Sequence, residues 1–277
     1  MKAIVTLASS AVIAAVVGAA AGYLSQRSLA VRQARIAYEA AARTRLYGAI
    51  GPLRFQLLLA VGDVLRRMNS HHLHTWIMSP SMYYSHSFIY RILRPLAIGE
   101  IVERQMNYAD FSVDAPAVAD ILRFNTAAYR FLTGSDALPY HSSLDWTSES
   151  QHVFRDNLRV AARRLLAEDA NGQQYVLDYG AFAEKYPDPL GDPALEPLAR
   201  LFGNCSSNLV ENPVWWTRLA AYAYACRWLL NRQGEVIGFA PRQLDIRVML
   251  ENTQDLEIAA HSSLYPAILD STLAEPL

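Results

Sequence analysis

The chain has 277 residues, of which 52% are hydrophobic and 18% are charged. This composition is too apolar for a disordered protein, and the length allows one large domain or two small ones with a substantial core. The formal net charge is −1, so no overall attraction to nucleic acid is expected. The two cysteines, Cys205 and Cys226, belong to no CxxC pair and no His/Cys cluster. That pattern excludes a disulfide framework and a zinc motif.

The N-terminal segment reads as a membrane-spanning helix. Residues 3–26 carry no charge. As a helix, residues 3–24 would span about 33 Å, close to the roughly 30 Å of a bilayer's hydrocarbon core. We therefore predict a transmembrane anchor over residues 1–26. A cleaved signal peptide is the alternative, because Ala19 and Ala21 would suit a small-x-small cleavage site.

The charges beside this segment predict its orientation. Only Lys2 and the amino terminus precede the apolar stretch, whereas the following residues carry five arginines opposed only by Glu39. These arginines are Arg27, Arg32, Arg35, Arg43 and Arg45. Because positive flanks stay on the cytoplasmic side, we expect a single-pass membrane protein with its N-terminus outside and its C-terminal domain in the cytoplasm. The same arginines predict contact with acidic membrane lipid.

Small residues recur along one side of the predicted anchor. Ala14, Gly18 and Gly22 are spaced by four. Such a small-xxx-small stripe lets two helix backbones approach closely in lipid, so we expect a homo-oligomer. The alternative is that an alanine-rich helix contains this stripe by accident.

The helix is predicted to continue beyond the membrane over residues 27–47. This stretch contains no glycine or proline, and the good helix formers alanine and arginine dominate it. Leu24, Val31 and Tyr38 are seven residues apart, as in a short heptad-like seam. We expect the sequence Gly48 to Pro52 to end this helix.

Residues 48–262 are predicted to form a multi-helix cytoplasmic bundle, which makes the chain all-α. Its expected helices cover about 53–68, 82–106, 114–132, 148–168 and 213–231. The helix at 213–231 has apolar residues on two sides, so we place it at the centre of the core. Residues 263–277 contain two prolines and little periodicity, and a loose C-terminal tail is expected there.

Three histidines follow two arginines near the middle of this region. The pairs Arg66–His71 and Arg67–His72 form an RxxxxH pattern, which resembles the ribonuclease motif of HEPN domains. Those domains are helical bundles, and some carry membrane helices. The resemblance covers only this short motif, and Arg67 stands where the family usually has a polar uncharged or acidic residue. It implies that Arg66 and His71 would be catalytic. No carboxylate lies at metal-ligand spacing nearby, so neither a metal nor a cofactor is predicted.

Two further charged groups have a structural interpretation. The first is an acidic stretch, for which we expect structural ion pairs rather than acid–base or metal chemistry. It contains Glu100, Glu103, Asp110, Asp114 and Asp120. The second is a basic stripe at a spacing of four, interpreted as a solvated helix face, with binding of acidic lipid, RNA or an acidic partner as the alternatives. It contains Arg155, Arg159 and Arg163.

The motifs of common enzymes are missing. The sequence has no glycine-rich phosphate loop, no GxSxG elbow and no HExxH motif. It therefore favours a membrane-anchored interaction or scaffold protein that self-associates and presents its domain to an unidentified cytoplasmic protein partner, rather than an enzyme. One alternative is a membrane-anchored effector with HEPN-like ribonuclease chemistry. Another is a helical domain that binds an apolar small molecule, because aromatic residues are plentiful around 76–90 and 215–228.

Overall fold

The computed structural model describes residues 2–73, 79, 82–106, 115–203, 205, 212–235, 238–239, 243–251, 253 and 255–275, without the side chains of 2–17, 20, 115 and 117. It is 75% helix with few strands. The longer helices are α1 (Lys2–Leu73), α2 (Tyr83–Met106), α3 (Ala115–Thr133), α4 (Arg155–Arg163) and α7 (Pro213–Gln233). The shorter ones are α5 (Tyr179–Lys185), α6 (Glu196–Gly203), α8 (Ile246–Glu251), α9 (Leu256–His261) and α10 (Tyr265–Ala274). Short 3-10 turns, η2 and η4, cover Pro189–Gly191 and Ser262–Leu264, and the strands are β1 (Leu166–Glu168) and β2 (Gln174–Val176).

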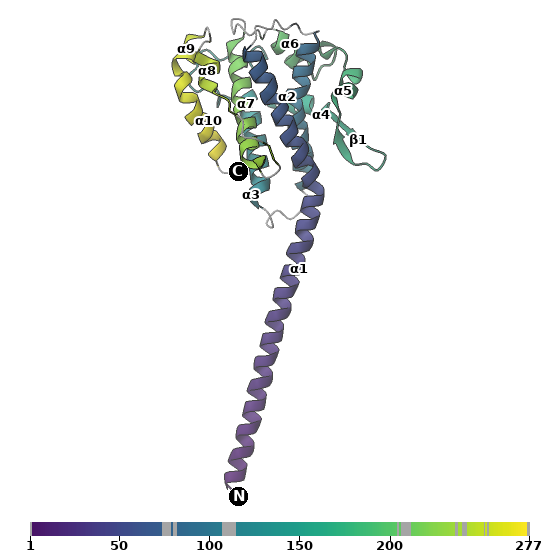
Figure 1. Ribbon diagram of the computed structural model, residues 1–277, viewed down its shortest axis with the longest axis vertical. Coiled ribbons are helices and arrows are strands. Elements are labelled where there is room, and N and C mark those ends of the chain that lie inside the picture. The colour runs from purple at the N-terminus through teal and green to yellow at the C-terminus, as the bar shows by residue number, and fades with distance from the viewer. Residues whose placement is uncertain are drawn as a thin grey trace.

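Helix α1 dominates the architecture. Figure 1 shows that it projects far from the rest of the chain, with the N-terminus at its distant end. From residue 18 to residue 41 its described side chains are exposed, except the half-buried Glu39, and the first buried one among them is that of Ala42. The helix then enters the domain, where it packs against α2 and α7. By length and composition, α1 is able to cross a membrane.

The expected helix end between Gly48 and Pro52 is wrong, because α1 continues unbroken to Leu73. A proline inside a helix costs about 3 kcal/mol through its missing N–H and its clash with the preceding turn. On both sides of Pro52 the helix buries large apolar side chains, among them Leu46 and Leu57. Each buried leucine contributes about 1.5–3 kcal/mol, so tertiary packing outweighs the local penalty.

Helix α7 lies at the centre of the core, as the two apolar sides of its sequence predict. It packs against both α3 and α1, and Trp215, Leu219 and Tyr222 are fully buried. The side chain of Asn212 caps the helix by accepting a hydrogen bond from the backbone N–H of Trp215, at 3.0 Å. The predicted helices at 82–106 and 114–132 are also present, as α2 and α3. Pro95 lies inside α2 without dividing it.

The predicted helix over 148–168 forms only in its middle part, as α4. The sequence Ser148 to Gln151 suggests a capping box, but both side chains bond to Asp145 instead. The hydroxyl of Ser148 donates to the Asp145 carboxylate, and the Gln151 side-chain oxygen accepts from the Asp145 backbone N–H at 2.7 Å. Because these hydrogen bonds hold residues 145–151 in a loop, the helix starts later, after Phe154.

A small antiparallel hairpin follows α4 where the sequence analysis expects helix. Leu166 pairs with Val176 and Glu168 pairs with Gln174. Gly172 in the connecting turn has φ of +76°, a left-handed conformation that glycine adopts without strain. The Asn171–Gly172 pair therefore forms a hairpin turn rather than a helix end.

The C-terminal segment is ordered, which corrects the expected loose tail over 263–277. Helix α10 covers residues 265–274, and Tyr265, Leu269 and Leu273 are buried along one side. It packs against α3, α7 and α8. Pro266 stands in its first turn, where proline is tolerated because that N–H has no partner within the helix.

The position of α7 predicts the effect of a cavity. Leu219→Ala should lower the free energy of unfolding of the full chain by about 2–5 kcal/mol, because Leu219 is fully buried. Denaturant unfolding in a mild detergent, followed by circular dichroism, measures this change. Leu256→Ala is the matched control, since Leu256 is 82% exposed. Equal stability of the two variants would contradict the central position of α7.

Candidate functional site

The residues of the predicted association stripe lie on an open part of α1. The backbone is helical at Ala14, Gly18 and Gly22, but the side chain of Ala14 lies outside the described side chains. A Cβ atom added at Gly18 or Gly22 would meet no atom of another element within 4 Å. Within the described residues, no other part of the chain covers this surface, so it is accessible to lipid or to a second helix.

The five arginines beyond the predicted anchor are all exposed. These are Arg27, Arg32, Arg35, Arg43 and Arg45. Arg35 pairs with Glu39 at 2.8 Å, and the Nε of Arg45 donates to the carbonyl of Ala41 at 3.3 Å. Large apolar side chains share this part of the helix with them. Those more than half exposed include Leu24, Leu29, Val31, Ile36 and Tyr38.

The two residues of the RxxxxH motif are not brought together. Arg66 is exposed and forms an ion pair with Asp63 one turn earlier in α1. His71 is fully buried, with its ring 5.4 Å from that of Trp216 and 5.8 Å from that of Phe88. A ribonuclease site needs both side chains in one cleft around the phosphate. Here one faces solvent and the other lies in the core.

Burial also decides the protonation of His71. Its two ring nitrogens have no hydrogen-bond partner among the described residues. Burial, assisted by the positive charge of Arg67, lowers the pKa of His71 to about 4. His72 lies stacked beside Trp216, and burial lowers its pKa as well. Both histidines are therefore neutral near pH 7, and His74 lies outside the described residues.

The acidic stretch forms structural ion pairs, as its sequence predicts. Glu100 is 2% exposed and receives Arg159 at 2.7 Å and Arg163 at 2.9 Å. The hydroxyl of Tyr129 also donates to it at 3.2 Å. Arg159 and Arg163 of the basic stripe therefore also serve an internal ion pair, while Arg155 and Arg163 remain exposed, as a solvated face predicts. Asp120 is likewise buried and paired, while Asp110 and Asp114 lie outside the described residues.

Of the described aromatic residues around 76–90 and 215–228, those buried in the core include Phe88, Trp215, Trp216 and Tyr222. Phe88 contacts Phe202 with ring centres 4.8 Å apart, and Phe202 contacts Trp215 at 5.8 Å. Within the described part of the chain, these rings pack directly on one another. In the same part, no group of three or more His, Cys, Asp or Glu side chains is placed to hold a metal ion.

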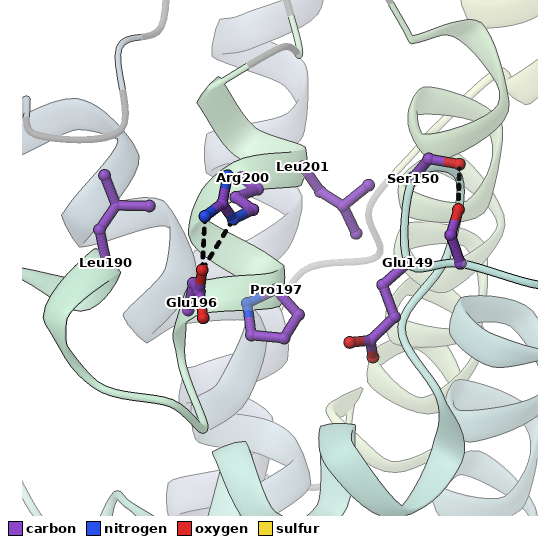
Figure 2. A pocket seen from close by; sticks show the side chains of 8 residues that line it. Glu149, Ser150, Leu190, Glu196, Pro197, Arg200 and Leu201 are labelled. Carbon is purple, nitrogen blue, oxygen red and sulfur yellow. Dashed lines mark hydrogen bonds and ion pairs between the residues drawn. The ribbon is translucent and has the colours of Figure 1, made fainter.

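An open hollow of about 590 Å³ lies between the loop at 148–150 and α6 (Figure 2). Its charged groups are used locally: Arg200 pairs with Glu196 at 2.6 Å, and Glu149 accepts the backbone N–H of Phe154 at 2.8 Å. Leu190, Pro197 and Leu201 also line the hollow, so its walls are mixed, and its charged side chains are engaged in these local contacts.

The sequence analysis misses one group of charged residues, which we name the arginine cluster. It consists of Arg66 and Arg67 on α1 together with Arg91 and Arg94 on α2. Asp63 contacts it through ion pairs to Arg66 and, at 3.4 Å, to Arg94. On α1, Arg66 and Arg67 follow Asp63 by three and four residues, and on α2 Arg91 and Arg94 are three apart, spacings that place side chains on one side of a helix. The arginines of α1 meet those of α2 because the two helices pack against each other.

Comparison with known proteins adds no relative: no family model, no curated protein and no solved structure matches the chain. The function is therefore argued from the geometry alone.

The buried histidine predicts a pH dependence of stability. The folded-state pKa of His71, about 4, lies below its unfolded value of about 6.5, so the unfolded chain binds the proton more readily between these values. Stability should be complete above about pH 6.5 and fall towards pH 4, by up to about 3 kcal/mol from this group. His71→Leu should reduce this slope without abolishing it, because His72 remains.

Denaturant unfolding of the full chain between pH 4 and pH 7 measures this slope. Leu219→Ala is the control, since it destabilises the core without removing a titratable group. An unchanged slope in His71→Leu would show that His71 does not couple folding to protonation.

Proposed function

We propose that the chain is a single-pass membrane protein that self-associates through α1 and presents its helical domain to protein partners in the cytoplasm. One observation carries this proposal: α1 is a single helix whose first part stands free of the domain and whose last part lies in the core (Figure 1). The helix that could cross a membrane is therefore continuous with the helix that organises the domain.

The uninterrupted helix supports a role as a spacer. Between the predicted membrane segment and Ala42, residues 27–41 would extend over about 23 Å. The domain would then stand clear of the lipid headgroups. Because α1 packs against α2 and α7, the domain would follow any movement of the membrane segment as one body. Such an arrangement suits presentation of a surface to cytoplasmic partners.

Self-association is supported by the exposed surface of the same helix. Leu24, Val31 and Tyr38 are each more than half exposed, and their spacing of seven places them along one side of a helix that meets a partner. Contact with a second copy would remove these apolar groups from water. Gly18 and Gly22 would allow close approach of the backbones within the membrane.

Ribonuclease chemistry is not proposed, since Arg66 faces solvent while His71 lies in the core. Apolar small-molecule binding is not proposed either, because the aromatic residues that motivate it pack on one another.

The five arginines after the predicted anchor make the topology testable. A C-terminal alkaline phosphatase fusion should be inactive in bacterial cells and a C-terminal green fluorescent protein fusion should fluoresce, because the positive flank retains the domain in the cytoplasm. Both activities are measured on whole cells at matched expression. An active phosphatase fusion would place the domain outside and overturn the proposed topology.

The glycine stripe makes self-association testable. Gly18→Ile together with Gly22→Ile should lower the oligomer mass in detergent, because the added side chains keep two backbones apart. Light scattering or native mass spectrometry measures the mass. Val16→Ile together with Ala20→Ile is the matched control, since these residues lie on the opposite side of the helix by the 3.6-residue repeat. The same mass in both double variants would show the stripe to be an accident of composition.

A further inference from the structure

The arginine cluster carries more positive charge than its surroundings neutralise. Among the described residues, Asp63 is the only carboxylate within ion-pair distance of the four arginines. Asp178 is a second carboxylate in the neighbourhood: burial raises the pKa of Tyr90, and the charges of Arg94 and Asp178 act on that same hydroxyl. Four guanidinium groups therefore share one carboxylate within ion-pair distance among the described residues, and a local excess of positive charge remains.

Two of the arginines are held by neutral groups. The Nη2 of Arg67 donates to the hydroxyl of Ser87 at 3.0 Å, and its guanidinium carbon lies 4.1 Å from the centre of the Tyr84 ring. The Nη1 of Arg91 donates to the backbone carbonyl of Ser87 at 3.1 Å. These contacts orient the guanidinium groups without neutralising them. Burial is the main cause that lowers the pKa of Arg91, and the nearby charge of Arg67 lowers it further.

An anion bound across the cluster would relieve this repulsion. Guanidinium groups bind carboxylate and phosphate oxygens through paired N–H donors, and groups already held in place lose little side-chain entropy on binding. Arg66 is the most accessible member, since its side chain is 58% exposed, whereas that of Arg94 is 25% exposed.

The position along α1 argues against lipid as the anion. Arg66 lies about 60 Å along the helix axis from the end of the predicted membrane segment. Exposed apolar residues at the start of α2 favour a protein ligand instead, because arginine, tyrosine and methionine are enriched where proteins meet. Met82 is 50% exposed and Tyr83 is 66% exposed.

We propose that the arginine cluster and Tyr83 form a docking surface for a carboxylate-rich segment of a partner protein. This docking surface specifies the chemistry of the protein partner that the proposed function assumes, and in that respect it rests on the proposed function. Its test uses the isolated full chain in an uncharged detergent, so it does not depend on topology or on self-association.

The test measures binding of a fluorescein-labelled peptide of ten glutamates by fluorescence anisotropy. The unmodified chain should bind it more weakly as salt rises, since charge pairs at a surface are screened. Arg66→Gln together with Arg91→Gln should raise Kd about tenfold, because two exposed charge pairs are lost. Asp63→Asn should instead lower Kd severalfold by releasing Arg66 and Arg94, an effect that a folding defect would not produce.

Arg27→Gln together with Arg32→Gln is the matched control. It also removes two positive charges, but from the exposed part of α1, and it should leave the Kd for the peptide unchanged. Three results would overturn the proposal: no binding of the glutamate peptide, equal loss in the control variant, or tighter cluster-dependent binding of a labelled ten-nucleotide RNA. The last result would assign the cluster to nucleic acid. If the chain does not bind the peptide, the proposals of membrane anchoring and self-association still stand. If those two proposals are disproved, the expected binding of the peptide is unchanged.

Discussion

The insertion of α1 into the core is the constraint on which the structure depends. Residues from Ala42 onward bury one side of α1 against α2 and α7, and this burial keeps the helix intact through Gly48, Gly51 and Pro52. A break at those residues would have separated the N-terminal segment from the domain by a hinge. The continuous helix instead joins them rigidly, so the direction of the N-terminal segment and the position of the domain are set together.

Buried polar groups connect the remaining elements around this helix. The carboxylate of Glu100 ties α2 to α4 through Arg159 and Arg163, and a buried carboxylate of this kind is tolerated because its charge is paired. Among the described residues, no carboxylate lies within ion-pair distance of Arg218 on α7. It donates instead to the backbone carbonyls of Gln151, at 3.0 Å, and Phe131, at 3.3 Å. It thereby fixes the long connection between α3 and α4 against the central helix.

The arginines of this chain thus have three different environments. Those of α4 neutralise a buried carboxylate, those between residues 27 and 45 stand on an exposed helix, and those of the arginine cluster crowd together at the surface between α1 and α2. The first group stabilises the fold, whereas the second and third leave positive charge available. An arginine-rich sequence with almost no net charge can therefore still carry local basic surfaces.

Local signals in the sequence determined the helical class, the apolar N-terminal helix and the positions of α2, α3 and α7. The cap at Asn212 and the two apolar sides of α7 illustrate why, since both act within one helix and need no knowledge of the rest of the chain. Of the candidate sites, the sequence located the open glycines and the exposed arginines of α1, because nothing else in the described chain covers them.

Tertiary structure decided the rest. It carried α1 through Pro52 and buried one side of α10. It also placed His71 in the core and Arg66 at the surface, and brought the arginines of α1 beside those of α2. Each of these outcomes depends on residues distant in sequence, whose burial or charge outweighs local preferences of a few kcal/mol.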